Sequence, residues 1–101
     1  MIFKKIQDVF KNSITLTCER WQHIIYRHPE LKRHQTKIVA TLKIPDTIIE
    51  DDLNKKVRLY HKFDKQLNGY LVVIVETEKK FIITSYVSLK IKRGKMIWQN
   101  N

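Results

Sequence analysis

Segment 19–30, ERWQHIIYRHPE, brings together two histidines and two arginines, a combination that could bind and cleave a phosphodiester. On a helix, this spacing places Arg20, His23 and Arg27 on one polar stripe, while His28 ends the adjacent apolar stripe. Histidine transfers protons near neutral pH, and the arginine guanidinium matches phosphate oxygens. The segment predicts an acid/base site, although a packed His28 and a solvated His23 would also suit a helix.

Segment 58–63, RLYHKF, has the alternation of a strand. One face would carry Arg58, Tyr60 and Lys62, a cationic surface that includes an aromatic ring. Such a surface suits base stacking and phosphate contact, so RNA binding is the functional interpretation. The alternative is a strand face that is simply exposed and charged.

Three hydroxyl groups follow an apolar run in segment 82–86, IITSY. Strand alternation puts Thr84 and Tyr86 on one face and Ser85 on the other. Thr84 is a candidate RNA contact, and Ser85 or Tyr86 could hold a phosphate oxygen. Hydroxyls are common on strands, so this segment adds support to the others and predicts no function by itself.

Metal and cofactor chemistry finds little support in the sequence. The only glycines, Gly69 and Gly94, cannot build a phosphate loop, and the single Cys18 leaves no zinc-binding spacing. Neighbouring acids occur only in segment 49–52, IEDD, whose turn-like composition has low specificity for magnesium. We expect a mechanism with no metal and no cofactor.

The chain carries 20 Lys and Arg against 10 Asp and Glu, a formal net charge of +10. This charge attracts polyanions by counterion release, so RNA or DNA is the expected partner, although such a surface can also serve solubility alone. Segment 89–95, LKIKRGK, is wholly basic, whereas four acids gather in 46–52. One side of the molecule should therefore be more positive than the average.

The length of 101 residues predicts a single domain, 1–101. The lone cysteine favours a reducing cytoplasm over an oxidising compartment. No segment has the apolar length of a signal-peptide core or a membrane span, so we expect a soluble cytoplasmic protein with no membrane partner. No pattern predicts an oligomeric state.

Helical periodicity precedes strand periodicity along the chain. After a strand over 13–17, a helix is expected from Cys18 to about His28, capped by Thr17, and a second helix over 34–44 should stop at Pro45. The later runs, 46–51, 56–63, 69–77, 80–90 and 95–99, have strand composition. This order predicts an α+β fold with helices on one face of an antiparallel sheet. The predicted core comprises Trp21, Ile24, Ile25, Ile38, Leu42, Val73, Val75, Ile82 and Trp98.

Five segments together resemble the phage Barnase-EndoU-Colicin-RelE-like (BECR-like) nucleases, a branch of a superfamily of small metal-independent RNases. They are ITLTCERWQHIIYRHPEL, TLKIPDTII, RLYHKF, VVIVETEKKFIITSY and GKMIW. The resemblance runs from Ile14 to Trp98, and segment 19–30 with IPDTI is its most specific part. It implies two N-terminal helices packed on one face of a roughly four-stranded antiparallel sheet, and an RNA-cleaving toxin or phage enzyme.

The resemblance also implies a set of site residues, which are His23, Arg27, His28, Tyr60, Lys62, Ser85 and Tyr86. We expect His28 to transfer the proton in preference to His23, because the helix end can turn its ring toward the sheet. Arg27 and Lys62 would balance the charge of the transition state. Arg20 and Arg58 would bind RNA.

The predicted function is therefore a metal-independent endoribonuclease that uses the 2′-OH of RNA as nucleophile. A competing hypothesis is an inactive RNA-binding domain on the same fold. A third is a protein-binding module whose basic surface meets an acidic antitoxin or immunity protein, which is compatible with either of the others.

Overall fold

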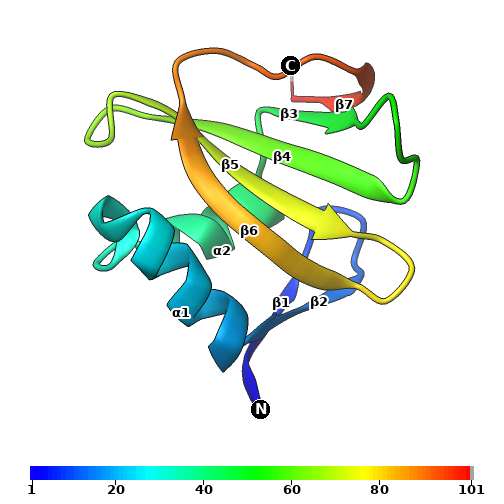
Figure 1. Ribbon diagram of the computed structural model, residues 1–101. Helices are drawn as coiled ribbons and strands as arrows, with labels where there is room; N and C mark the ends of the chain where they lie inside the picture. The colour runs from blue at the N-terminus through cyan, green and yellow to red at the C-terminus, as the bar shows by residue number, and fades with distance from the viewer. Residues whose placement is uncertain (101) are drawn as a thin grey trace.

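The computed structural model describes residues 1–100 as an α+β fold (Figure 1). The helices and strands in chain order are β1 (Ile2–Gln7), β2 (Ser13–Thr17), α1 (Cys18–Arg27), the short 3-10 helix η1 (Pro29–Leu31), α2 (Gln35–Lys43), β3 (Thr47–Glu50), β4 (Val57–Asp64), β5 (Gly69–Glu76), β6 (Phe81–Ser88) and β7 (Lys95–Gln99). The predicted α+β class is confirmed, and each predicted strand and helix is present.

Within residues 1–100 the strands form one seven-stranded sheet in the order β1-β2-β6-β5-β4-β3-β7. Neighbours are antiparallel except β2 and β6, which run parallel and meet at Thr15 and Phe81. The expected four-stranded antiparallel sheet is therefore wrong. The sheet is larger and mixed because the β1–β2 hairpin joins it beside β6.

The expectation that two helices lead the fold is also wrong, because β1 and β2 precede α1. The sequence does not predict strand β1, because its apolar signal is weak. Ile6 is its only buried residue, and Ile2 and Phe3 remain exposed at this edge of the sheet. Edge strands with lysines and one buried side chain lack the alternation that identifies a half-buried strand.

Helix α1 forms where the capping residues predict it. The Thr17 hydroxyl accepts the Arg20 N–H at 3.1 Å, and Glu19 lies in the first turn, where the helix dipole favours negative charge. The helix ends at His28, whose N–H donates to the Ile24 carbonyl, because Pro29 cannot follow a helical residue without a clash. These contacts fix the position of His28 at the helix terminus.

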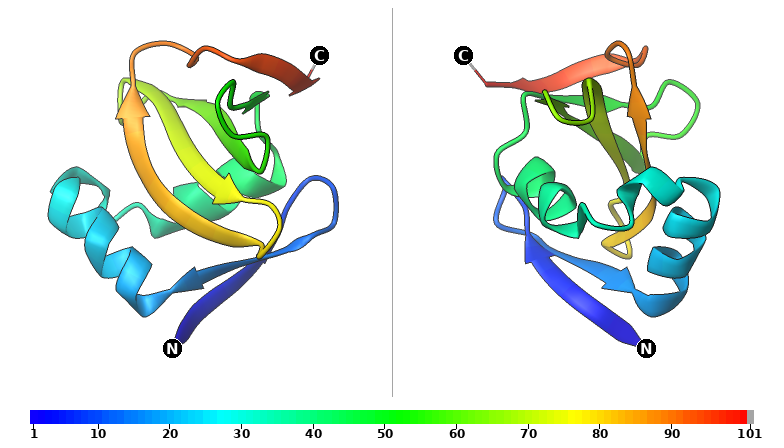
Figure 2. Two further views of the ribbon diagram at one scale, coloured as in Figure 1. Left: turned by 45° about the vertical axis from the view of Figure 1, so that its right-hand side comes forward. Right: turned by 90° about the vertical axis from the view of Figure 1, so that its left-hand side faces the viewer.

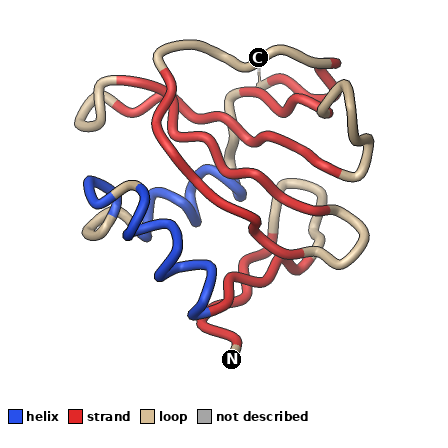
Figure 3. Tube along the Cα trace, viewed as in Figure 1, coloured by secondary structure: helices blue, strands red, loops and turns tan. Residues whose placement is uncertain are grey.

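Helix α2 packs against β4 and β5, while α1 runs beside β6 (Figure 2). Ile38, Thr41 and Leu42 form the buried face of α2. An ion pair of 2.6 Å between Lys37 Nζ and an Asp64 carboxylate oxygen joins α2 to the end of β4. Both helices consequently gather at one side of the curved sheet, as Figure 3 shows.

The main core fills the space between the helices and the sheet. Of the predicted core residues, six are fully buried: Ile24, Ile38, Leu42, Val73, Val75 and Ile82. Trp21 and Trp98 pack against this core from its margin. Ile25 is half-exposed, so the prediction is wrong at that position. Strand β5 is central and buried on both faces, as its continuous apolar run predicts.

Candidate functional site

A second apolar cluster lies on the sheet face that α2 does not cover, which we call the open face. Its buried members are Ile49, Leu59 and Val72, and Tyr86 and Ile91 pack against them. Val72 and Tyr86 are register partners on β5 and β6, so the Tyr86 ring belongs to this face. The open face therefore offers an apolar floor with a phenol at its margin.

Helix α1 brings His28 to the border of the open face. The His28 ring centroid lies 5.9 Å from that of Tyr86, with a tilt of 34° between the rings. Nδ1 of His28 lies 3.8 Å from a Glu30 carboxylate oxygen, and 33% of the histidine side chain is exposed. His28 thus combines a fixed position with access to solvent, which a proton-transfer group requires.

Lys92 approaches Tyr86 from the segment that connects β6 to β7. Its Nζ lies 5.7 Å from the Tyr86 ring centroid, over the ring. Burial raises the pKa of the Tyr86 hydroxyl, which keeps its proton at neutral pH and can donate it in a hydrogen bond. We call His28, Tyr86 and Lys92 the border cluster; it contains an acid/base group, a hydrogen-bond donor and a cation.

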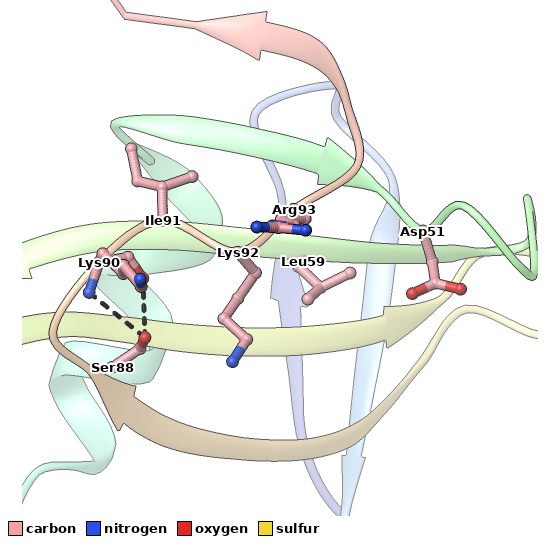
Figure 4. Close-up of a pocket in the computed structure, with 7 residues that line it drawn as sticks. All are labelled: Asp51, Leu59, Ser88, Lys90, Ile91, Lys92 and Arg93. Carbon is pink, nitrogen blue, oxygen red and sulfur yellow. Dashed lines mark hydrogen bonds between the residues drawn. The ribbon is translucent and has the colours of Figure 1, made fainter.

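The segment 89–94 arches over the open face and encloses a cleft of about 410 Å³ (Figure 4). The cleft is lined by Asp51, Leu59, Ser88, Lys90, Ile91, Lys92 and Arg93. Figure 4 shows Lys92 and Arg93 reaching over the strands near Leu59, with Asp51 at one end. Positive charge above an apolar floor suits a ligand with both a phosphate and a base.

The predicted RNA face of β4 points the other way, into the helix-covered side. Tyr60 is 1% exposed, and its hydroxyl donates to Oδ2 of buried Asp8 at 2.5 Å. The expectation that the Tyr60 ring stacks a base is therefore wrong, because no surface of the ring is available. Arg58 stacks on the Phe10 ring at 5.2 Å and its buried Nε has no hydrogen-bond partner within residues 1–100.

Three further candidates are engaged in structural contacts. Lys62 Nζ donates to the Ile44 carbonyl at 2.7 Å, on the helix side of the sheet, so it does not meet His28 and Tyr86 as expected. Ser85 is fully buried, and its hydroxyl donates to the Val72 carbonyl at 2.7 Å. Arg20 donates to the Ile83 carbonyl at 3.2 Å and ties α1 to the edge of β6.

The remaining candidates, Arg27, His23 and Thr84, lie on the same two elements as His28 and Tyr86. Arg27 is exposed in the last turn of α1, one residue before His28, and His23 is half-exposed one turn earlier. Thr84 shares the open face with Tyr86, as strand alternation predicts, because it is the register partner of Ile74. His28, Arg27, Thr84 and Tyr86 thus stay available to a ligand.

Sequence patterns do not identify two residues that the structure makes important, Lys92 and His61. Lys92 was noted only as part of a basic run, since no periodic pattern predicts where a loop places its side chains. His61 lies on the face of β4 opposite Lys62, and its residue type in a strand predicts no role. Its ring is fully buried, with Nδ1 2.9 Å from the Leu59 carbonyl and Nε2 3.0 Å from the Lys92 backbone nitrogen.

Comparisons with protein-family models, curated proteins and solved structures find no match to this chain. Within residues 1–100, no three side chains of His, Cys, Asp or Glu lie close enough together to hold a metal ion. In the same range no helix has both the length and the apolar composition to cross a membrane.

Proposed function

We propose that this protein is a metal-independent endoribonuclease of the cytoplasm that binds RNA on the open face of its sheet. The observation that carries the proposal is the border cluster, in which the ring centroid of a solvent-accessible His28 lies 5.9 Å from that of Tyr86, and Lys92 Nζ lies over the same Tyr86 ring. The net charge of +10 favours a polyanionic substrate. The resemblance of segments 14–98 to BECR-like nucleases supports the same activity.

In the proposed reaction, neutral His28 takes the proton of a ribose 2′-OH. The resulting oxygen forms a bond to the adjacent phosphorus, the bond from phosphorus to the 5′ oxygen breaks, and that oxygen takes a proton from solvent. The products are a 2′,3′-cyclic phosphate and a free 5′-OH. DNA has no 2′-OH and would bind without being cleaved.

The other border residues act on the charge that develops at phosphorus. The Nζ of Lys92 and the guanidinium of Arg27 would stabilise the extra negative charge, and the Tyr86 hydroxyl would donate to a non-bridging oxygen. Lys92 takes the part expected of Lys62, whose Nζ is bound to the Ile44 carbonyl. Of the two hydroxyls expected to hold a phosphate oxygen, Tyr86 takes this part, because the Ser85 hydroxyl is bound to the Val72 carbonyl. His23 would contact substrate at most.

The basic surface also suits a protein partner. A toxin-like RNase in the cytoplasm needs a neutralising protein, and an acidic antitoxin or immunity protein would match a net charge of +10. Such a partner would inhibit cleavage by covering the border cluster, and its binding would weaken as salt concentration rises.

Incubation of purified protein with RNA in EDTA tests the proposed function. We expect RNA products that end in 2′,3′-cyclic phosphate, while DNA of the same sequence stays intact. His28→Ala should lose about a hundred- to ten-thousand-fold in cleavage rate and still bind RNA, because a positioned acid or base contributes that much. His23→Ala is the matched control and should lose less.

Binding without cleavage would show an inactive RNA-binding domain in place of an enzyme. Full activity of folded His28→Ala would remove His28 from the reaction. If His23→Ala collapses and His28→Ala does not, the roles of the two histidines are reversed.

A further inference from the structure

The cleft under segment 89–94 continues the border cluster. Lys92 belongs to both, since its Nζ lies over the Tyr86 ring and its side chain lines the cleft. Leu59, Ile91 and Tyr86 also belong to one apolar cluster on the open face. A strand whose phosphate lies at Lys92 would therefore meet His28 and Tyr86 on one side and the cleft on the other.

The lining of the cleft matches one nucleotide better than a bare anion. Lys92 and Arg93 supply cations, and Leu59 supplies an apolar surface for a planar base (Figure 4). At one end, Oδ2 of Asp51 accepts the N–H groups of Leu53 and Asn54, each at 3.0 Å. Oδ1 of Asp51 can accept a hydrogen bond from the amino group of a nucleobase.

Segment 89–94 holds its shape through contacts at both ends. The Ser88 hydroxyl donates to the Lys90 carbonyl at 2.7 Å, next to the end of β6. At the other end, Gly94 has φ of 143°, and a Cβ there would collide with the Glu50 carbonyl oxygen of β3. Only glycine lets the chain approach β3 so closely.

The middle of the segment is held by the buried ring of His61. The ring is 0% exposed, and its geometry fixes one tautomer: Nδ1–H donates to the Leu59 carbonyl at 2.9 Å, so Nε2 accepts the Lys92 N–H at 3.0 Å. One neutral imidazole thus ties the backbone of Lys92 to β4. Protonation would turn Nε2 into a donor that faces the Lys92 N–H.

We propose that the cleft binds the nucleotide next to the cleaved phosphodiester, and that His61 is the positioning residue that keeps this cleft formed. The proposal rests on the proposed RNA cleavage, because it concerns the same open face. The proposal predicts that RNA binding weakens at low pH, although the protein becomes more positive there.

The groups around His61 favour its neutral form. Burial lowers the pKa of the imidazole, and the charge of Lys92 lowers it further, while the Leu59 and Thr47 carbonyls act in the opposite direction. The Tyr70 ring stands edge-on to it, with centroids 6.3 Å apart, and Asp46 before β3 directs its carboxylate to the Phe63 N–H. Lys92 is therefore the cation that a protonated His61 ring would repel.

Binding of a short 2′-O-methylated RNA, which cannot be cleaved at its blocked 2′ oxygens, tests the proposal. We expect the Kd to rise about tenfold between about pH 7.5 and about pH 5. This is the effect of losing one charged hydrogen bond to the RNA when Lys92 is displaced. Electrostatics alone predicts the opposite, because a protein becomes more positive as pH falls and then attracts a polyanion more strongly. In His61→Gln, the amide oxygen of the glutamine can accept the Lys92 N–H at any pH. This variant should bind RNA as tightly as the wild type near pH 7.5 and should lose the pH dependence.

Two further variants locate the site. Arg93→Ala should weaken binding about tenfold at neutral pH, whereas Lys5→Ala on exposed β1 removes the same charge far from the cleft and should change it little. Hydrogen exchange at the Lys92 amide reports the His61 contact without RNA. As pH falls, the exchange rate in the folded wild type should rise relative to the rate in His61→Gln.

Tighter binding at low pH, with a slow Lys92 amide throughout, would overturn the proposal. Equal losses in Arg93→Ala and Lys5→Ala would also overturn it, and RNA cleavage that depends on His28 would then leave the proposed function intact. Conversely, the expected pH dependence and Arg93 effect without any cleavage would support the cleft and contradict the proposed enzyme.

Discussion

The two faces of strand β4 differ from what their residue types suggest about which face is covered by other elements and which lies toward the cleft. Arg58, Tyr60 and Lys62 have the composition of a nucleic-acid surface, yet they lie on the side covered by the β1–β2 hairpin and α2. Leu59 and His61 have the composition of a core, yet they underlie the basic segment 89–94. The face that carries the cleft is therefore the apolar one, and the positive charge at the cleft comes from a neighbouring loop.

This difference shows that alternation and coverage are separate properties of a strand. Alternation decides which side chains share a face, and it follows from backbone geometry. Coverage depends on which distant segments pack on each face, as the Tyr60 hydroxyl does on Asp8, fifty-two positions away along the chain. A polar residue with a buried partner can accordingly belong to a core.

The largest expected effect compares one tyrosine from each face. Tyr60→Ala removes a buried ring and the partner of Asp8, and should lower the free energy of unfolding by about 3–5 kcal/mol. Tyr86→Ala removes a ring that is partly exposed and should cost well under half as much, while it reduces RNA cleavage. Urea denaturation measures both losses. Equal losses would mean that the two faces are equally covered.

The second effect is the dependence of stability on pH, which probes His61 under the loop. Its pKa is lowered in the folded protein, so the native state resists the proton that the unfolded chain binds. Stability is complete above the unfolded pKa of about 6.5 and should fall below it by up to about 1.4 kcal/mol per pH unit.

His61→Gln is the control for this titration. It should flatten the stability profile between about pH 6.5 and about pH 5. The lowered pKa values of Asp64 and Glu78 act only at more acid pH, since carboxyl groups in unfolded chains titrate near pH 4. An unchanged slope in His61→Gln would assign the effect to other groups.

The smallest effect concerns Ser85, which shares a strand with Tyr86 and faces the other way. Ser85→Ala loses one hydrogen bond to the Val72 carbonyl and should cost about 1 kcal/mol in stability. Cleavage by the folded variant should remain unchanged. A large loss of activity with normal stability would restore Ser85 as a substrate contact.

Local signals explain why most elements were predictable. Thr17 and Pro29 delimit α1, and Pro45 follows α2, because capping and proline geometry act over a few residues. Strand β1 was not predictable in the same way, since one buried residue, Ile6, gives no periodic pattern. Its pairing with β2, and the contact of β2 with β6, depend on packing between distant segments.

The candidate site was only partly predictable for a similar reason. His28 and Tyr86 were both selected from local patterns, and the structure brings their rings together. Lys62 was placed with them because its residue type suited a phosphate, whereas Lys92 supplies that charge from a loop. The position of a loop lysine depends on a contact such as that of His61 with the Lys92 N–H, which no local pattern reveals.

The most direct test of a functional open face compares two lysines under one assay. Lys92→Ala and Lys62→Ala each remove one ammonium group, the first from the border cluster and the second from the helix-covered side. We expect RNA cleavage in EDTA to fall on the order of a hundredfold in Lys92→Ala, the effect of losing a contact to the developing charge, and to stay near the wild-type rate in folded Lys62→Ala. Loss of cleavage in Lys62→Ala with full activity in Lys92→Ala would contradict the assignment and move the site to the other face of the sheet.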